Sequence, residues 1–346
     1  MRVTFVSRRQ FALGGLVLVG GGLAGCGGGR NKTTTATPPL GQATSASPSP
    51  SPSPTGLSYH PFTGASAGLT NPVIAIKIDN THPAHPQAGL KSADIIYVEQ
   101  VEGGETRIMA IFSSTLPKKV GPVRSARISD VHLLAQYGKP AFGFSGVQSK
   151  MKPVIKAASV YDVSDHGVPP YYRDGGRRAP YNLFADPHKL LAKAPHATGP
   201  RDIGFRFGDA PAAGGRAMAS FTAAWPAEKI RFSWSAKAKK YLVSYSGRPD
   251  TAAEGGRLSA DTVVIQYAKT TRSRFHDFLG NYTPLIETTG TGKALVMRDG
   301  MAYDCTWSRP SESVGTTFTT SDGKVMNFKP GQTWVALVND GKPYTP

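Results

Sequence analysis

The hydrophobic pattern between residues 59 and 206 combines strand-like runs with helical spacing. Short runs rich in Val and Ile predict three strands, at residues 73–78, 95–98 and 106–112. Ile128, Val131 and Leu134 fall three residues apart, which indicates one face of a helix. Asp186-Pro187 supplies an N-cap and a first-turn proline for a second helix over residues 188–194. The pattern predicts an α+β domain over residues 58–209, a layered mixed sheet with helices.

After an Ala- and Gly-rich connection near residues 210–219, the pattern becomes that of strands. Asp299-Gly300 and Asp322-Gly323 each lie between apolar runs and predict tight hairpins, because both central positions of such turns accept positive φ. Residues 263–266 and 333–338 predict further strands, and helical spacing is scarce after Phe221. A β-rich second domain is therefore expected over residues 210–346.

Residues 1–25 have the order of a signal peptide: a basic start, an apolar stretch and a small-residue cleavage site. Arg8 and Arg9 stand in a segment that resembles the twin-arginine export motif. An ordinary secretory signal with two chance arginines is the alternative. Leu23-Ala24-Gly25-Cys26 reads as a lipobox, so we expect Cys26 to carry diacylglycerol and palmitate and to anchor the chain on the extracytoplasmic face of the cell membrane.

The stretch from residue 26 to 57 is rich in Pro, Ser and Thr and ends in Ser-Pro alternation. Such a composition cannot bury enough apolar area to offset the entropy cost of ordering. It predicts a disordered linker that is stiffened toward polyproline II and spaces the domains from the membrane.

The charge of the chain favours anionic partners. The formal net charge is +17, and it remains +14 once the signal peptide has taken Arg2, Arg8 and Arg9 with it. Outside the cell such partners are lipid headgroups, anionic wall polymers or acidic glycans, and export excludes nucleic acid. Cys305 has no intramolecular partner if Cys26 is lipidated, so we expect it to be a small buried apolar residue.

Several segments taken together resemble the YerB-like lipoproteins, a family of two-domain proteins of unassigned function. In the first half these segments are Asn80, residues 86–90, 93–95, 102–104, 106–107, 121–127, 173–174 and 178–184. In the second half they are Trp234 and residues 258–260, 290–294 and 331–334. The resemblance spans about residues 59–340 and implies a layered α+β domain followed by a β-rich one, with no established activity. The family usually has His where this chain has Tyr181, so no role for an imidazole at that position carries over.

The segment from Gly121 to Arg127 is the best candidate for a binding site. If Gly121-Pro122 enters a helix, Arg124, Ser125 and Arg127 lie near a helix N-terminus that favours anions. Guanidinium groups bind phosphate or carboxylate in bidentate fashion, and Arg107 could join them. The equally weighted alternative is that these arginines pair with Asp94, Glu99, Glu102 or Glu105 and fasten the helix to the sheet.

Two other places carry candidate polar groups. Arg173, Arg177, Arg178 and Asn182 lie in a loop with Tyr171, Tyr172 and Tyr181, a combination suited to sugars and anions, although a solvated loop is the alternative. Asp79 and Asn80 end an apolar strand, where a sheet presents functional side chains or where Asx residues shape a turn.

Most established chemistries lack support in the sequence. His82-x-x-His85 has prolines beside both histidines and no adjoining Cys or acidic residue, so we expect no metal site and no cofactor. The chain also lacks the hydrolase, metalloprotease, P-loop and dinucleotide motifs, and no catalytic residue is assigned.

Two hypotheses about function remain. The first is a non-catalytic lipoprotein that binds an anionic wall polymer, a glycan or an envelope protein. The alternative is an enzyme acting on phosphorylated or glycan wall material through Asp79, Arg107, Arg124 and Arg127.

Overall fold

The structure is a computed structural model that describes residues 59–66, 68, 70–277 and 279–341. Arg8, Arg9, Cys26 and the Pro-rich linker lie outside the described residues, so what we expect of them stays a prediction. Across the described part of the chain, no helix is both long enough and apolar enough to cross a membrane.

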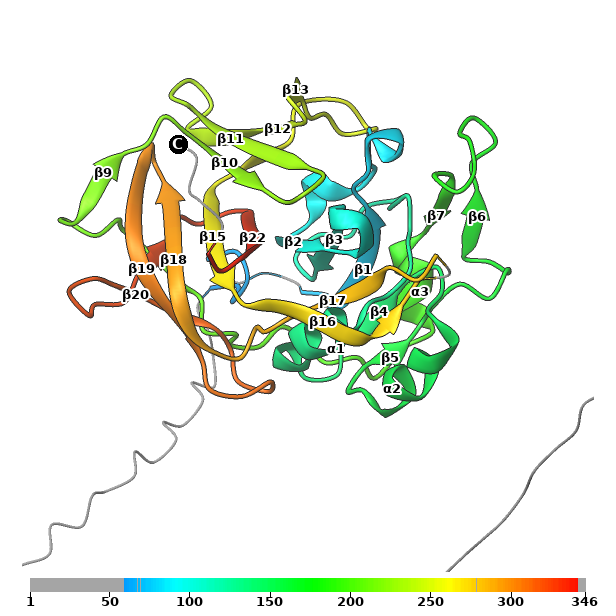
Figure 1. Cartoon of the computed structure of the whole chain (residues 1–346). Helices are drawn as coiled ribbons and strands as arrows, with labels where there is room; N and C mark the ends of the chain where they lie inside the picture. Colours follow the sequence, from blue (N-terminus) through cyan, green and yellow to red (C-terminus); the bar gives the residue numbers. More distant parts are fainter. Residues whose placement is uncertain (1–58, 67, 69, 278, 342–346) are drawn as a thin grey trace, which may run out of the picture. The chain divides into compact units, whose positions relative to one another are not determined.

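One mixed sheet of eleven strands organises the described residues (Figure 1). Its order is β20-β19-β18-β15-β22-β2-β3-β1-β4-β5, with β9 added beside β19. The strands are β1 (Ile74–Asp79), β2 (Ile95–Gln100), β3 (Thr106–Phe112), β4 (Ala141–Gly143), β5 (Tyr161–Asp162), β9 (Gly215–Ala217), β15 (Thr262–Ala268), β18 (Gly290–Arg298), β19 (Met301–Arg309), β20 (Thr317–Thr320) and β22 (Thr333–Asn339).

Smaller elements surround this sheet. A five-stranded sheet comprises β10 (Ser220–Ala224), β11 (Lys229–Ser235), β12 (Lys240–Tyr245), β13 (Arg248–Pro249) and β14 (Ser259–Ala260). Three two-stranded pairs are β6 (Tyr171–Arg173) with β7 (Leu183–Ala185), β8 (Arg206–Phe207) with β21 (Asn327–Phe328), and β16 (Thr270–His276) with β17 (Tyr282–Ile286). The α-helices are α1 (Ile128–Leu134), α2 (Lys152–Ala157) and α3 (Pro187–Ala192).

The last strand, β22, joins the two halves of the chain. It pairs in parallel with β2 on one side and with β15 on the other. Strands from the N-terminal and C-terminal halves thus share one hydrogen-bonded sheet, and β15, β22 and β2 point in the same direction.

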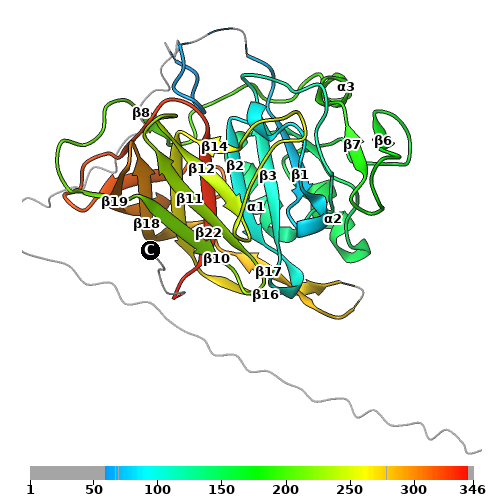
Figure 2. The same ribbon diagram turned by 90° about the horizontal axis from the view of Figure 1, so that it is seen from above.

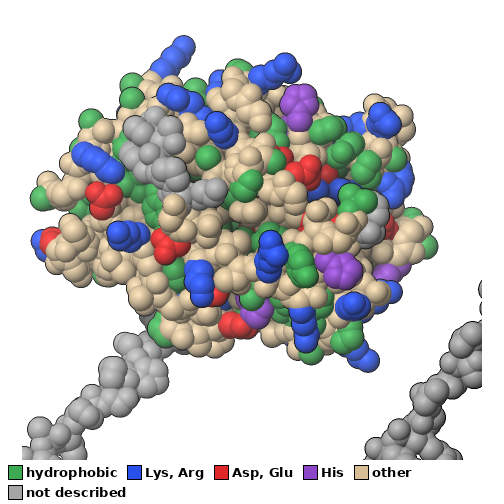
Figure 3. Space-filling view, in the orientation of Figure 1, with side chains coloured by type: hydrophobic (Ala, Val, Ile, Leu, Met, Phe, Trp, Pro, Cys, Tyr) green, Lys and Arg blue, Asp and Glu red, His purple; other side chains and the backbone are tan. Residues whose placement is uncertain are grey.

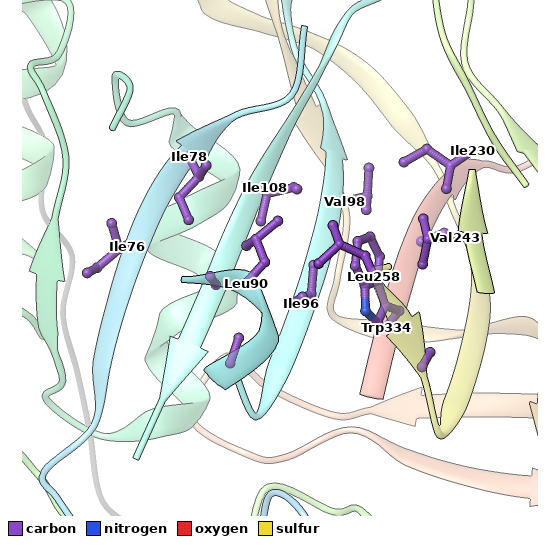
Figure 4. Close-up of a cluster of buried hydrophobic side chains, with 14 of the residues drawn as sticks. Ile76, Ile78, Leu90, Ile96, Val98, Ile108, Ile230, Val243, Leu258 and Trp334 are labelled. Carbon is purple, nitrogen blue, oxygen red and sulfur yellow. The ribbon is translucent and has the colours of Figure 1, made fainter. Parts of the chain in front are cut away.

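The large sheet separates two apolar layers. On one face the five-stranded sheet packs over it (Figure 2), with Phe232 and Trp334 in edge-to-face contact at 5.9 Å between ring centroids. Figure 4 shows Ile96 and Val98 in this layer beside Trp334. On the other face α1 and α2 pack against residues such as Met109. Burial of these side chains is the main stabilising contribution.

The architecture confirms the α+β class, with a mixed sheet and helices first and a β-rich part after it. The strands expected at 73–78, 95–98, 106–112, 263–266 and 333–338 are present as β1, β2, β3, β15 and β22. The helices expected around Ile128 and after Asp186 are α1 and α3, and the Asp186 carboxylate accepts from the His188 amide at 3.0 Å. The boundary between the two domains, placed at residues 209 and 210, stays a prediction.

Only one of the two Asp-Gly turns has the expected form. Asp299 and Gly300 have φ of 51° and 75° and join β18 to β19 with two turn residues. At the second turn Gly323 has positive φ and Asp322 does not. The longer turn there closes with the Thr320 amide donating to the Lys324 carbonyl at 2.8 Å, which relieves Asp322 of the need for positive φ.

Candidate functional site

A pocket of about 620 Å³ lies between the loop that follows β1 and the loop between β6 and β7. We call it the loop pocket. Its lining residues are Pro83, His85, Pro86, Gly176, Arg177, Arg178, Ala179, Pro180 and Tyr181.

Two arginines give this pocket its positive charge. Arg177 Nη2 donates to the Ala84 carbonyl at 2.9 Å and so ties the two loops together. Arg178 is exposed, and among the described residues its side chain has no hydrogen-bond or ion-pair partner. Its guanidinium therefore keeps its full capacity to bind an anion.

Tyr181 connects the pocket to a cluster of charges behind it. The Arg124 guanidinium lies 5.9 Å from the Tyr181 ring centroid, and Arg124 Nε is 2.7 Å from Asp79 Oδ2. The two groups form an ion pair without the alignment of a hydrogen bond. Asp79 Oδ2 therefore has no hydrogen-bond partner. Burial lowers the pKa of Arg124, and the Asp79 carboxylate opposes that effect.

Asp79 is fully buried and serves two arginines as well as its own turn. Arg107 Nη1 lies 3.4 Å from Asp79 Oδ1, and the same arginine is 3.4 Å from Glu105 Oε2. The Thr81 amide and hydroxyl both donate to Asp79 Oδ1, at 2.9 and 2.8 Å. The turn alternative for Asp79 and its pairing with arginines therefore hold together.

The segment from Gly121 to Arg127 is not a helix, which corrects the expected geometry. It is extended: Gly121 bridges Ala88, Val123 bridges Ile78, and α1 begins only at Ile128. Arg124 and Arg127 consequently do not share a helix face. The Asp130 carboxylate already accepts from the Arg127 amide at 2.5 Å at the start of α1, so this helix end has no free anion site.

Arg127 is occupied by an acidic partner, as the structural alternative expects. Arg127 Nε lies 2.8 Å from each oxygen of Glu102, and Nη2 is 2.7 Å from Oε2. Burial would raise the pKa of Glu102, but the Arg127 charge together with the hydrogen bonds from Arg127 and Thr283 lowers that pKa. Ser125 lies half-buried beside this pair, and its carbonyl accepts from Arg127 Nη1 at 3.2 Å.

Asn80 belongs to a buried polar network on the opposite face of β1. Its Nδ2 donates to Thr106 Oγ1 at 2.7 Å, and its Oδ1 accepts from Gln87 Nε2 at 3.0 Å. Next to Gln87, the His85 ring nitrogen Nδ1 is 2.9 Å from Asp250 Oδ1. Asn80 therefore acts in the structure as a connector between β1 and residues of the second half.

Glu228 and Tyr245 complete this network. Glu228 Oε2 accepts from the Thr106 amide at 2.7 Å, and Tyr245 donates to Glu228 Oε1 at 2.5 Å. The Tyr245 ring stacks on the His85 ring with 4.2 Å between centroids. Burial raises the pKa of Glu228.

The remaining loop residues support the walls of the pocket. Arg173 Nη1 donates to Asn182 Oδ1 at 2.8 Å across the β6–β7 pair. Tyr171 is buried and donates to the Val163 carbonyl at 2.7 Å, whereas Tyr172 is exposed. Arg173 and Asn182 thus bind each other, whereas Arg177 and Arg178 line the pocket.

A second charged cluster lies on the helix-covered face of the sheet. Lys77 is completely buried, contacts Glu99, and its Nζ is 2.5 Å from Asp130 Oδ1. Burial raises the pKa of Glu99 to about 8. Burial would lower the pKa of Lys77, but Asp130 and Glu99 together raise it.

The structure also shows groups that sequence reasoning did not assign. A lysine inside the apolar run Ile74–Ile78 is a sequence signal for a buried charge, and it could have drawn attention to Lys77. Asp250 and Glu228 carry no such signal, because their roles depend on long-range packing. His85 drew attention only for its spacing from His82.

Two further features bear on chemistry. No group of three or more His, Cys, Asp or Glu side chains that could hold a metal ion occurs among the described residues. Cys305 is buried, and burial raises the pKa of its thiol to about 12, as expected for a packing residue.

Lys and Arg side chains are scattered over the face drawn in Figure 3, with Asp and Glu side chains among them. Positive charge on this face is therefore spread rather than gathered into one continuous patch.

Comparison with known proteins shows the family. A model of the N-terminal domain of DUF3048, a family described as proteins of unknown function, matches residues 62–201, and the model of its C-terminal domain matches residues 221–335. A relative from Bacillus subtilis (strain 168), named "Putative lipoprotein YerB", is 26% identical over 277 residues, which are 77% of this chain and 81% of that protein.

A solved structure shows the same fold. The crystal structure of the YerB protein from Bacillus subtilis superposes with a TM-score of 0.68 at 23% identity, covering 82% of this chain and 97% of that one. The expected resemblance to YerB-like proteins is confirmed, and the relative's name agrees with the lipoprotein prediction. The chain belongs to the DUF3048 family, whose N-terminal and C-terminal domains it carries in that order.

Proposed function

We propose that this protein is an exported lipoprotein, anchored through Cys26 to the extracytoplasmic face of the cell membrane, that binds an anionic group of an envelope component in the loop pocket. The bound group is a phosphate or a carboxylate of a wall polymer, a glycan or an envelope protein. The lipobox, the Pro-rich spacer and the basic mature chain support this placement.

Arg178 is the observation that carries the proposal. It is exposed at a concave site, has no partner among the described residues, and lies beside Arg177 and Tyr181. Arg107, Arg124 and Arg127 each form an ion pair with a carboxylate, so none of them offers a free binding group. They contribute positive electrostatic potential and rigidity instead. Guanidinium forks bind phosphate and carboxylate in bidentate fashion, which favours an anion over a cation or an apolar ligand here.

The contacts of His85 favour binding over catalysis. His85 is the imidazole that lines the loop pocket. Its Nδ1 contacts Asp250, and its Nε2 lies 3.3 Å from Gln87 Nε2 and 3.4 Å from the Asn80 carbonyl. A general base has to reach a proton of the substrate, and both ring nitrogens here face protein groups.

Binding is tested with the mature chain from residue 26, carrying Cys26→Ser so that no lipid is added. Inorganic pyrophosphate and a wall polymer that carries phosphate groups serve as probes in calorimetric titrations. We expect Arg178→Ala to weaken binding by about tenfold, the equivalent of roughly 1.4 kcal/mol. Arg248→Ala removes the same charge from an exposed site outside the pocket and should change affinity much less.

Two results would contradict the proposal. Equal losses in Arg178→Ala and Arg248→Ala would reduce the binding to net charge, and turnover of the polymer by the unmodified protein would favour the enzymatic alternative. Anchoring is tested by cell fractionation, in which full-length Cys26→Ser should leave the membrane fraction. Retention there would argue against a lipid tether at Cys26.

A further inference from the structure

A second pocket, of about 580 Å³, lies at the end of the large sheet under hairpin β16–β17. We call it the strand-end pocket, and its lining includes Gln100, Thr271, Arg272, Tyr282 and Asn339. Its volume is within the range of about 300–1,000 Å³ that small-molecule sites occupy. It shares no lining residue with the loop pocket.

The position of this pocket follows from three parallel strands. β15, β22 and β2 are neighbours with the same direction, and Ala268 at the end of β15 is in register with Asn339 at the end of β22. Gln100 ends β2 at the same edge. Figure 1 shows hairpin β16–β17 beginning at the end of β15 and extending from there toward α1. Ligands commonly bind beyond the carboxyl ends of parallel strands, because the chain leaves the sheet there and opens a crevice.

The side chains in the pocket have unused hydrogen-bonding capacity. Among the described residues, no partner engages the side-chain amide of Gln100, the hydroxyl of Thr271 or the hydroxyl of Tyr282. Asn339 uses Oδ1 to accept from the Thr270 amide at 3.1 Å, which leaves its Nδ2 to donate. Carboxamides and hydroxyls that both donate and accept match the hydroxyl and amide groups of sugars.

An aromatic ring and a single cation complete the lining. Tyr282 is 53% exposed, and the Arg272 guanidinium lies 5.3 Å from its ring centroid. Tyrosine offers a rigid apolar face with a polar end, which suits the face of a sugar ring. The described lining contains no Asp or Glu to hold a cation and no Leu, Ile, Val, Met or Phe to favour a lipid chain.

We propose that the strand-end pocket binds a saccharide unit of a glycan, with the sugar ring against Tyr282 and its hydroxyl or acetamido groups on Gln100, Thr271 and Asn339. Arg272 accommodates a carboxylate where the sugar carries one. This site is additional to the loop pocket and does not depend on anion binding there.

The experiment titrates the mature Cys26→Ser chain with three defined oligosaccharides: an N-acetylglucosamine tetramer, a neutral glucose tetramer and a galacturonate trimer. We expect at least one to bind, and its affinity to fall by about tenfold in Tyr282→Ala, since stacking and burial at the ring are lost. Gln100→Ala should weaken the same ligand without removing any aromatic surface. Val325→Ala, which truncates an exposed apolar side chain that lines neither pocket, should leave the affinity unchanged.

Each result decides for or against the site. Loss of binding in Tyr282→Ala and Gln100→Ala, with Arg178→Ala unaffected, supports it. Absence of binding by all three probes overturns it, as does binding that survives both pocket variants. Galacturonate binding that depends on Arg178 alone would assign the acidic sugar to the loop pocket, and vesicle binding that depends on the exposed Leu279 would make this hairpin a membrane contact. Either of the last two outcomes overturns the saccharide site.

Discussion

Lys77 lies within β1 among apolar neighbours, and none of its side chain is exposed. Removing a charge from water costs several kcal/mol unless partners compensate for it. Glu99 and Asp130 both contact the Lys77 ammonium, so two carboxylates share one cation. Burial, together with the negative charge of Asp130, explains why the pKa of Glu99 rises to about 8.

We expect Glu99→Gln to flatten the pH dependence of the free energy of unfolding between about pH 5 and pH 8. In the folded state Glu99 holds a proton up to about pH 8, whereas the ordinary pKa is 4.5. The folded state therefore binds more protons in this window, and stability falls as pH rises through it. Glutamine resembles the protonated carboxyl group and does not titrate. The variant therefore lacks the contribution of Glu99 to the pH dependence of the free energy of unfolding.

Urea unfolding at several pH values measures this effect. Burial raises the pKa of Asp94 to about 6, so Asp94 also makes stability fall as pH rises at the acidic end of this window. This contribution persists in Glu99→Gln. Glu287→Gln changes a partly buried glutamate, whose side chain is 42% exposed, and is the control. Identical slopes in the unmodified protein and Glu99→Gln would show that Glu99 is ionised when buried.

At the scale of elements, the segment from Gly121 to Arg127 shows how pairing overrides a turn signal. Gly121-Pro122 suggests entry into a helix, but bridges to Ala88 and Ile78 hold the chain extended until Ile128. Local spacing is reliable for α1 itself because its apolar face packs against the sheet. The first residue of the helix depends on the bridges to Ala88 and Ile78, which local spacing does not predict.

The hairpin turn between β18 and β19 provides a test at this scale. Gly300 has φ of 75°, and a Cβ built on it would lie 2.9 Å from Trp234 Nε1. Gly323 has φ of 79°, and a Cβ there would meet nothing within 4 Å. We expect Gly300→Ala to destabilise the protein by about 1–3 kcal/mol through backbone strain and crowding together. Gly323→Ala imposes backbone strain without crowding, so we expect it to lower the free energy of unfolding by less.

Chemical unfolding of the two variants measures the difference. Equal losses would mean that Trp234 moves aside at no cost. A smaller loss for Gly300→Ala than for Gly323→Ala would contradict the close approach to Trp234.

At the scale of the whole molecule, the two halves depend on one sheet. β2 pairs with β22, and Trp334 of β22 is buried with Ile96, Val98 and Phe232. A fragment of residues 59–209 would expose the backbone edge of β2 and this apolar layer to water. The halves match two family domains in sequence, but their packing predicts mutual dependence.

We therefore expect residues 59–209 alone to lack a cooperative unfolding transition, and mixing with residues 210–346 to restore one. Thermal unfolding followed by near-ultraviolet circular dichroism measures both. A cooperative transition in the isolated fragment, with a well-dispersed amide spectrum, would instead support two independently stable domains.

Local patterns in the chain predict the α+β class, the positions of the main strands and helices, and the residues that approach the candidate site. Those features depend on near neighbours: periodic apolar positions, an Asp-Pro cap and an Asp-Gly turn. Residues far apart in the sequence share no local signal, and Thr283 nevertheless donates to Glu102 across 181 positions.

Tertiary structure alone decides which charges are free. Arg107, Arg124, Arg127 and Arg178 are equivalent cations in sequence, yet packing gives the first three carboxylate partners and leaves Arg178 open at a pocket. It also brings β15, β22 and β2 side by side and so creates the strand-end pocket. The physical reason is that pairing and burial act through space, between residues whose separation along the chain carries no information about their contact.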